Sequence, residues 1–185
     1  MSSPLRTFLA AAALVLTLAP SAYAAIRVDG KPKVSFFATG SPGWLDIEGV
    51  ASSISAADDG TKLTFTVPMT SVSTGIGMRD DHMNKEFVQV DKFPNAILSF
   101  AKADVTWPAA GGAATEGSVN ATFNIHGVDQ PVTVTYNVGS TKTGYRVKAK
   151  FNFDASAAGI SIPSYMGVTV DPKMRSEVTL DLVDG

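Results

Sequence analysis

The chain of 185 residues carries 15 Lys and Arg against 17 Asp and Glu, a net charge of −2, and this balance excludes a protein that binds nucleic acid through an excess of positive charge. Cysteine is absent, which excludes disulfides, thiolate metal sites and a cysteine nucleophile. His82 and His126 are the two histidines, too few for a three-histidine zinc centre, and no metal or cofactor is expected.

The N-terminal 24 residues have the pattern of a secretory signal. Arg6 supplies a positive charge, residues 8–18 form an apolar run, and Ala22-Tyr23-Ala24 matches a cleavage site. The apolar run is shorter than the roughly 20 helical residues that span a bilayer. We therefore predict a cleaved signal at 1–24 and one exported domain at 25–185. An uncleaved membrane anchor is the alternative.

Beyond the signal, alternating apolar and polar residues dominate the sequence. Val132, Val134 and Tyr136, for example, alternate with Thr133 and Thr135, and this period of two predicts strands with one apolar face. Parallel sheets show continuous apolar runs instead, so we expect antiparallel strands. The eight predicted strands are, in chain order, 34–38, 44–52, 62–67, 96–102, 118–125, 132–138, 145–153 and 178–182.

One segment departs from this alternation and predicts a short helix near residues 78–90. Met83 and Phe87 are four residues apart and share one helix face. Pro94 prevents the helix from continuing. We expect this helix to lie across one end of the β-structure.

Eight antiparallel strands that share an apolar face must close or stack to bury it. A barrel leaves no free edge, and a two-sheet sandwich is the alternative. A barrel of eight strands is wide enough either to be filled by its own side chains or to hold one small ligand. Six aromatic residues fit both arrangements, as the wall of a tunnel or as a filled core: Phe36, Phe65, Phe123, Tyr136, Phe151 and Phe153.

Motifs of common enzymes are absent from the sequence. It contains no G-x-S-x-G elbow, no H-E-x-x-H pair and no glycine-rich phosphate loop of the usual spacing, and neither histidine has a triad context. We therefore expect a protein that binds rather than catalyses. A hydrolase that uses His82 is the alternative from another functional class.

Three segments together resemble the YceI-like family. The most specific, 73–94, combines a Ser-Thr pair with an Arg-Asp-x-His-Met run at 79–83, a phenylalanine, and a Lys-Phe-Pro turn at 92–94. Residues 121–132 resemble the family's strand-turn-strand, in which a Gly-Val turn leads into a Pro-Val strand. Residues 163–170 resemble its C-terminal portion. The resemblance covers most of residues 26–183.

This resemblance implies an all-β, eight-stranded antiparallel lipocalin-like barrel in the bacterial periplasm. It also implies that domain 25–185 binds or carries a polyisoprenoid, isoprenoid quinone or similar amphiphilic lipid inside the barrel. The alternative is a non-catalytic envelope interaction module with a filled barrel. The residues expected to contact the lipid are Phe36, Phe65, Val67, Phe123, Ile125, Val134, Tyr136, Phe151 and Phe153.

Arg79, Asp80 and His82 are expected to hold the lipid head group at the mouth of the barrel. Arginine suits a phosphate because its planar guanidinium donates two parallel hydrogen bonds. In the structural alternative, Asp80 caps the helix and Arg79 pairs with a carboxylate that fixes the helix to the barrel rim. Release of the lipid requires an equally apolar destination, so we expect a transient contact with a membrane or a membrane protein.

Overall fold

The computed structural model describes residues 26–41, 43, 45–165 and 167–184. The predicted secretory signal at 1–24 lies outside these residues. The described residues contain twelve strands, which join into one sheet whose pairs are all antiparallel, as the alternation predicts. A single curled sheet rules out the alternative of two stacked sheets.

The elements follow one another along the chain with short connections. The strands are β1 (Ile26–Ser41), β2 (Leu45–Ala51), β3 (Ser55–Asp58), β4 (Lys62–Pro68), β5 (Val72–Ser73), β6 (Asn95–Ala101), β7 (Thr115–Ile125), β8 (Val128–Ser140), β9 (Gly144–Asp154), β10 (Ser164–Tyr165), β11 (Val168–Val170) and β12 (Lys173–Asp184). The helical elements are α1 (Gly77–His82), a π-helical segment η2 (Met83–Phe87) and two 3-10 turns, η1 (Met69–Ser71) and η3 (Lys102–Asp104).

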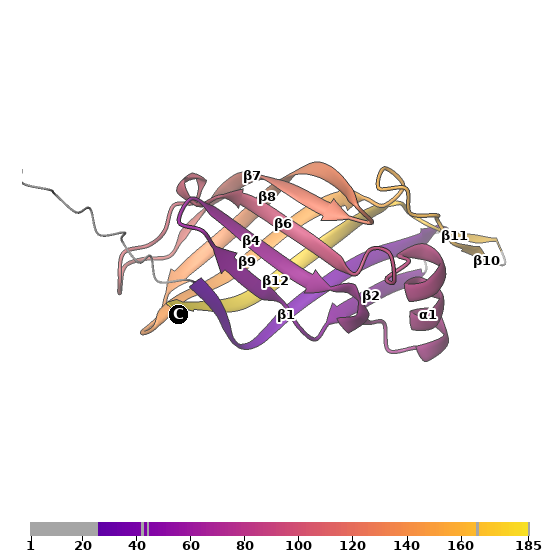
Figure 1. Cartoon of the computed structure of the whole chain (residues 1–185), viewed down its shortest axis with the longest axis horizontal. Helices are drawn as coiled ribbons and strands as arrows, with labels where there is room; N and C mark the ends of the chain where they lie inside the picture. The colour runs from indigo at the N-terminus through magenta and orange to yellow at the C-terminus, as the bar shows by residue number, and fades with distance from the viewer. Residues whose placement is uncertain (1–25, 42, 44, 166, 185) are drawn as a thin grey trace, which may run out of the picture.

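Eight of the strands curl into a barrel in the hydrogen-bonded order β1–β12–β9–β8–β7–β6–β4–β3 (Figure 1). The predicted all-β antiparallel barrel is confirmed, with a correction to its strands. The predicted strand at 44–52 is β2, which lies outside the barrel wall and pairs with β1 and β5. Its place in the wall is taken by β3, which the alternation does not predict because Ser-Ala-Ala-Asp contains only small or polar residues.

The two ends of the barrel carry different elements (Figure 1). The first, here called the helix end, carries α1, β10 and β11. The opposite end carries the C-terminal part of β12 and the loop between β6 and β7. This loop contains Trp107, and we call this end the Trp107 end. The location of a site is therefore described by the barrel end near which it lies and by the strand face that carries its residues.

The hairpin between β7 and β8 shows how the sequence sets the register of the wall. His126 and Gly127 form its two-residue turn, and both have positive φ, 54° and 75°. Two consecutive residues of this kind make a type I′ turn, whose twist matches that of paired strands. A Cβ at Gly127 would lie 2.8 Å from Cε1 of Phe93, so glycine is required there for space as well as for backbone conformation.

A seam between β1 and β3 closes the barrel without a hydrogen-bonded ladder among the described residues. Cα atoms of the two strands approach within 8 Å, but their backbones share no register. The register of β1 with β12 shifts between Asp29 and Lys33, where Gly30 has φ +69° and Pro32 has no N–H to donate. The edge of β1 that faces away from β12 pairs with β2 from Val34 to Gly40, so this stretch of β1 has no free edge for β3.

The predicted short helix near 78–90 is confirmed as α1 followed directly by η2, and it lies at one end of the barrel (Figure 1). Met83 and Phe87 pack against the core from this segment, as their spacing predicts. Gln89 has φ +51° and ends the helix before Pro94. None of the described helices is long and apolar enough to cross a membrane.

Candidate functional site

The barrel encloses a narrow cavity of about 70 Å³, counted as the space that the centre of a water molecule can reach. Seven of the eight barrel strands line this cavity, together with Ile54 before β3 and the loop after β6. Its described lining is apolar or aromatic except at Ser176, so the space suits an uncharged, mainly hydrocarbon ligand.

Most of the residues predicted to contact a lipid surround this cavity. The seven that line it are Phe36, Phe65, Val67, Phe123, Val134, Tyr136 and Phe151. The other two, Ile125 and Phe153, are buried in the core nearer the helix end and do not line the cavity. Strand alternation predicts the face that a residue occupies, but not its height along the barrel. Lipid contact by the seven lining residues stays a prediction.

Aromatic rings close the cavity toward the helix end. The ring of Phe123 lies 4.9 Å, centroid to centroid, from the rings of Phe151 and Phe153. Phe36 meets Phe153 edge to face at 6.4 Å. Beyond these rings, buried side chains that do not line the cavity, such as Val88, fill the barrel. The helix end of the barrel is therefore sealed.

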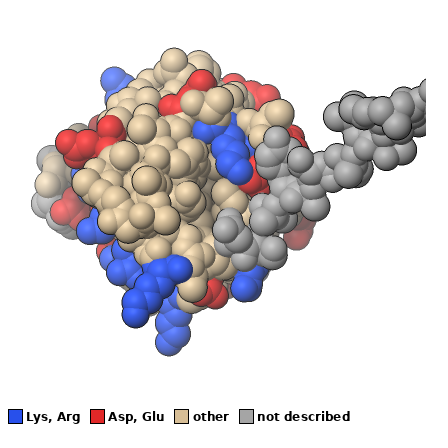
Figure 2. Space-filling view, turned by 90° about the vertical axis from the view of Figure 1, so that its left-hand side faces the viewer, with Lys and Arg blue, Asp and Glu red and all other residues tan. Residues whose placement is uncertain are grey.

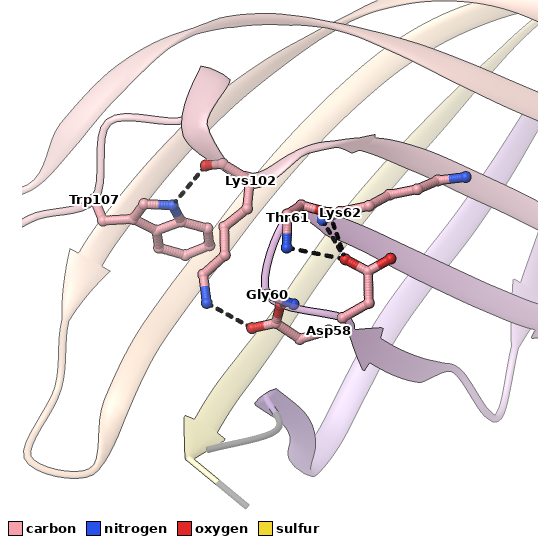
Figure 3. Close-up of polar contacts among 7 residues, drawn as sticks. Asp58, Gly60, Thr61, Lys62, Lys102 and Trp107 are labelled. Carbon is pink, nitrogen blue, oxygen red and sulfur yellow. Dashed lines mark hydrogen bonds and ion pairs between the residues drawn. The ribbon is translucent and has the colours of Figure 1, made fainter. Parts of the chain in front are cut away.

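Trp107 lines the cavity at the opposite end. Its Nε1 donates a hydrogen bond to the Lys102 carbonyl oxygen at 3.2 Å, and its ring lies 5.0 Å from that of Tyr145. Lys102 extends from this point to Asp58 at the end of β3, with 2.5 Å between Nζ and Oδ2 (Figure 3). The Asp58 side chain has no exposed area, and the Gly60 N–H donates to its other oxygen. This ion pair joins the end of β3 to η3, the turn that follows β6.

The surface of the Trp107 end is uncharged at its centre, with charged side chains arranged around it (Figure 2). Asp59 holds the turn between β3 and β4, in which Figure 3 labels Gly60 and Thr61. Its carboxylate accepts hydrogen bonds from the backbone N–H groups of Lys62 and Thr61 and from the Thr61 hydroxyl. These bonds lower the pKa of Asp59 below its ordinary value. Asp59 thus stabilises the turn in its charged form.

The residues predicted to hold a head group lie at the helix end, and none of them lines the cavity. Arg79 donates from Nε to the Thr74 hydroxyl at 2.7 Å and from Nη2 to the Thr74 carbonyl oxygen at 2.8 Å. Asp80 accepts hydrogen bonds from the Ser73 hydroxyl at 2.6 Å and from the Thr74 N–H at 2.8 Å. His82 is exposed. The sealed aromatic end separates all three from the cavity.

The structure also differs from the structural alternative, in which Asp80 caps the helix and Arg79 pairs with a carboxylate. Ile76 occupies the N-cap position of α1, without a side-chain hydrogen bond, so Asp80 does not cap the helix. Among the described residues, Arg79 forms no ion pair with a carboxylate within 4 Å. Both side chains instead bind the 73–74 segment and hold it against α1. Their role in binding a head group stays a prediction.

Acidification is expected to loosen the segment between β5 and α1. Burial favours the neutral form of Asp80, but hydrogen bonds from Ser73 and Thr74 outweigh it and lower the pKa below the ordinary 3.8. A carboxyl with a lowered pKa stabilises the folded state above its unfolded pKa, and this contribution disappears as the pH falls through the folded value. The hydrogen-exchange protection factor of the Thr74 amide should therefore be constant from pH 7 to 5 and fall below about pH 4.

The Asp80→Asn variant provides the control for this prediction. Its side chain cannot ionise, so the protection factor of the Thr74 amide should be low at every pH. An equal fall on acidification in both proteins would show that another group controls the segment.

The two histidines occupy separate sites. His82 is on α1, whereas His126 is in the β7–β8 turn. There its Nδ1 lies 3.0 Å from the Ala158 carbonyl oxygen, and its ring packs against the Phe93 ring at 4.2 Å between centroids, tilted by 52°. In the described part of the chain, no three His, Cys, Asp or Glu side chains gather as a metal site would require. A hydrolase that uses His82 would have to work outside the cavity.

Sequence reasoning missed several residues that line the cavity. Leu98 and Phe100 face inward from β6, but Ile97 on the opposite face obscures their alternation. Trp107 lies in a loop of small residues, outside any predicted strand. A single large aromatic residue within such a loop indicates that its side chain packs into a core. This feature could have identified Trp107.

A comparison with protein families shows to which family this chain belongs. The sequence profile of the YceI-like domain matches residues 31–183, from within β1 to within β12. The chain belongs to the YceI-like family. A comparison with curated proteins finds no match.

Solved structures share the barrel of this YceI-like protein. A polyisoprenoid binding domain from Saccharophagus degradans, implicated in plant cell wall breakdown, has a TM-score of 0.68 at 15% identity, over 86% of this chain and 98% of that chain. BcnA of Burkholderia cenocepacia has a TM-score of 0.65 at 20% identity, over 83% of this chain and 98% of that chain. At these identities the likeness shows a common fold.

Proposed function

We propose that this YceI-like protein binds a polyisoprenoid, an isoprenoid quinone or a similar amphiphile, with the apolar chain inside the barrel. The observation that carries the proposal is the cavity inside the barrel, whose lining of apolar and aromatic side chains suits a hydrocarbon chain. The driving force is the transfer of hydrocarbon out of water, about 0.8 kcal/mol for each buried CH₂ group. The protein holds its ligand and carries it through an aqueous compartment.

The comparisons and the sequence support this proposal in different ways. The Saccharophagus degradans domain with the same fold is described as polyisoprenoid binding, and the cavity of this chain has a lining of matching character. The signal pattern at 1–24 supports export, and we place the protein in the periplasm. A carrier in this compartment delivers its lipid to a membrane or a membrane protein, which offers an equally apolar destination.

An envelope interaction module with a filled barrel is the competing function. It requires an interior filled by side chains, whereas an apolar cavity lies between the aromatic rings and Trp107, and this cavity supports the carrier. Among the described residues that line the cavity, Ser176 has no histidine or carboxylate beside it that could activate its hydroxyl. We therefore assign a binding role to this protein.

Lipid analysis of the purified protein tests the proposal. Protein produced from the full-length chain should release about one amphiphile per molecule when extracted with organic solvent, and native mass spectrometry should show the same mass before extraction. Re-addition of the lipid at 100 times its Kd should stabilise the emptied protein by about 2.7 kcal/mol. Protein that yields no lipid and whose melting temperature does not respond to geranylgeraniol or ubiquinone would favour the interaction module.

A further inference from the structure

The segment between β5 and α1 exposes two large apolar side chains. Ile76 is 53% exposed and Met78 is 75% exposed, the highest values among the large apolar residues that the structure describes. Gly75 and Gly77 flank Ile76, and a Cβ at either position would meet no atom within 4 Å, so the space on both sides of Ile76 is open. Exposure of this extent at two neighbouring positions exceeds that of the scattered apolar residues of an ordinary surface.

Val50 adds a third exposed apolar side chain to this surface. It is 38% exposed and pairs with Ser73 on β5. The Ser73 hydroxyl in turn donates to Asp80 in α1 at 2.6 Å. Side chains that lie directly opposite on antiparallel strands share one face of the sheet, so Val50 lies beside the start of α1. We call Val50, Ile76 and Met78 the apolar tip.

Hydrogen bonds hold the backbone beneath the apolar tip in one conformation. The Thr74 N–H and hydroxyl donate to Asp80 at 2.8 and 2.5 Å, and Arg79 donates to the Thr74 hydroxyl and carbonyl oxygen. Gly75 has φ +77°, which lets the chain turn directly before Ile76. Because this order is present before a partner binds, docking loses little backbone entropy.

The position and size of the apolar tip favour a lipid bilayer as its partner. The tip lies at the helix end of the barrel (Figure 1), and the described loops of the Trp107 end expose no large apolar side chain. A stable protein interface buries about 800 Å² on each partner, far more than three partly exposed side chains supply. Insertion into a bilayer needs no matching surface, because each apolar group gains free energy separately as it leaves water.

The charges beside the apolar tip indicate how it would bind a bilayer. Residues 72–78 are uncharged. On α1 and η2, the exposed Asp81 and Glu86 stand against the exposed Lys85, so these helices present no excess of positive charge to anionic lipids. Attachment therefore depends on apolar insertion. It should be weak and reversible, since even one long acyl chain gives only marginal membrane binding.

We propose that the apolar tip is a docking surface for a lipid bilayer, in which Ile76 and Met78 insert at the boundary between head groups and acyl chains. The inference goes beyond the proposed function, because it assigns a second surface, at the end of the barrel opposite the Trp107 end. Docking at this surface leaves the Trp107 end uncovered and does not require a ligand inside the barrel.

The absence of cysteine from the chain allows a fluorescent label at a single position. Met78→Cys carries a nitrobenzoxadiazole label, and Lys142→Cys, at an exposed position of the β8–β9 loop, carries the same label as the matched control. Each emptied protein is mixed with phosphatidylcholine vesicles that contain no isoprenoid. Emission should rise and shift to shorter wavelength for the label at position 78 and stay unchanged at position 142. Addition of Ile76→Ser to the Met78→Cys protein should lower its partition constant by about threefold to tenfold.

Vesicle flotation tests the unlabelled protein. The double variant Ile76→Ser, Met78→Ser should bind phosphatidylcholine vesicles at least about tenfold more weakly than wild type. Val128→Ser is the control, because Val128 is also exposed, at 39%, but lies in the β7–β8 hairpin, outside the apolar tip. Its binding should equal that of wild type. Circular dichroism verifies that all variants are folded.

The possible outcomes separate this inference from the proposed function. An equal response of the labels at positions 78 and 142, or equal flotation of wild type and the double variant, would show that the docking surface is wrong. Flotation only with vesicles that contain membrane proteins would replace the bilayer by a protein partner. Because the barrel is empty throughout, failure here leaves the carrier function standing. A protein that docks but yields no isoprenoid on extraction would contradict the carrier function and leave the docking surface in place.

Discussion

Replacement of Ala149 by phenylalanine is expected to weaken lipid binding strongly while the barrel remains folded. Ala149 faces the cavity from the middle of β9, where it pairs with Tyr136 and Val178, which also line the cavity. A phenyl ring at this point occupies the space that the chain of the ligand needs. Displacement of about three CH₂ groups at about 0.8 kcal/mol each would raise the Kd by roughly fiftyfold.

Lys148→Phe is the matched control, because it adds the same ring to the neighbouring, exposed position of β9. Circular dichroism and thermal unfolding establish that both variants are folded, and lipid titration then compares their Kd values. Unchanged affinity in a folded Ala149→Phe protein would place the ligand outside the barrel.

The largest effect on stability is expected from Lys102→Met. The substitution leaves the Asp58 carboxylate, which has no exposed area, without its cation. Breaking a buried ion pair from one side typically costs about 3–5 kcal/mol, because the remaining charge is desolvated and unpaired. The free energy of unfolding, measured by urea denaturation, should fall by about this amount.

Arg146→Met provides the comparison for this prediction. Arg146 pairs with Asp181 at 2.8 Å, but its side chain is 61% exposed, and exposed pairs contribute about 0–1 kcal/mol. The double variant Asp58→Asn, Lys102→Met removes both charges and should recover part of the lost stability. Equal losses for Lys102→Met and Arg146→Met would contradict the assignment of a buried, energetically important pair.

Much of the wall could be predicted because its strands alternate strongly. In β7 and β8, Val119 pairs with Val134 and Ala121 with Val132, and all four side chains are buried, as the period of two requires. The strand β3 could not be predicted, because its small residues carry no alternation. Its position depends on pairing with β4 and on the ion pair of Asp58, and both are long-range contacts that a local pattern does not contain.

The candidate site was predictable only in part for a similar reason. Phe123 and Phe153 both face inward, yet one lines the cavity and the other fills the sealed end. Arg79 lies in the most recognisable motif of the chain, but a motif does not specify which end of a barrel it occupies. Ser176 was not predicted to line the cavity, because a serine at the start of an alternating segment is typical of a strand end.

The contact between β1 and β3, which has no backbone hydrogen bonds among the described residues, is the least stable contact between neighbouring strands of the barrel. Parting any other neighbours of the wall would break a row of backbone hydrogen bonds, whereas these two strands share none among the described residues. Thermal opening should therefore concentrate along this line, beside Ile54, which borders the cavity. A long, flexible ligand would then enter the barrel from the side, between these two strands, and the hydrogen bonds of the remaining sheet would stay intact.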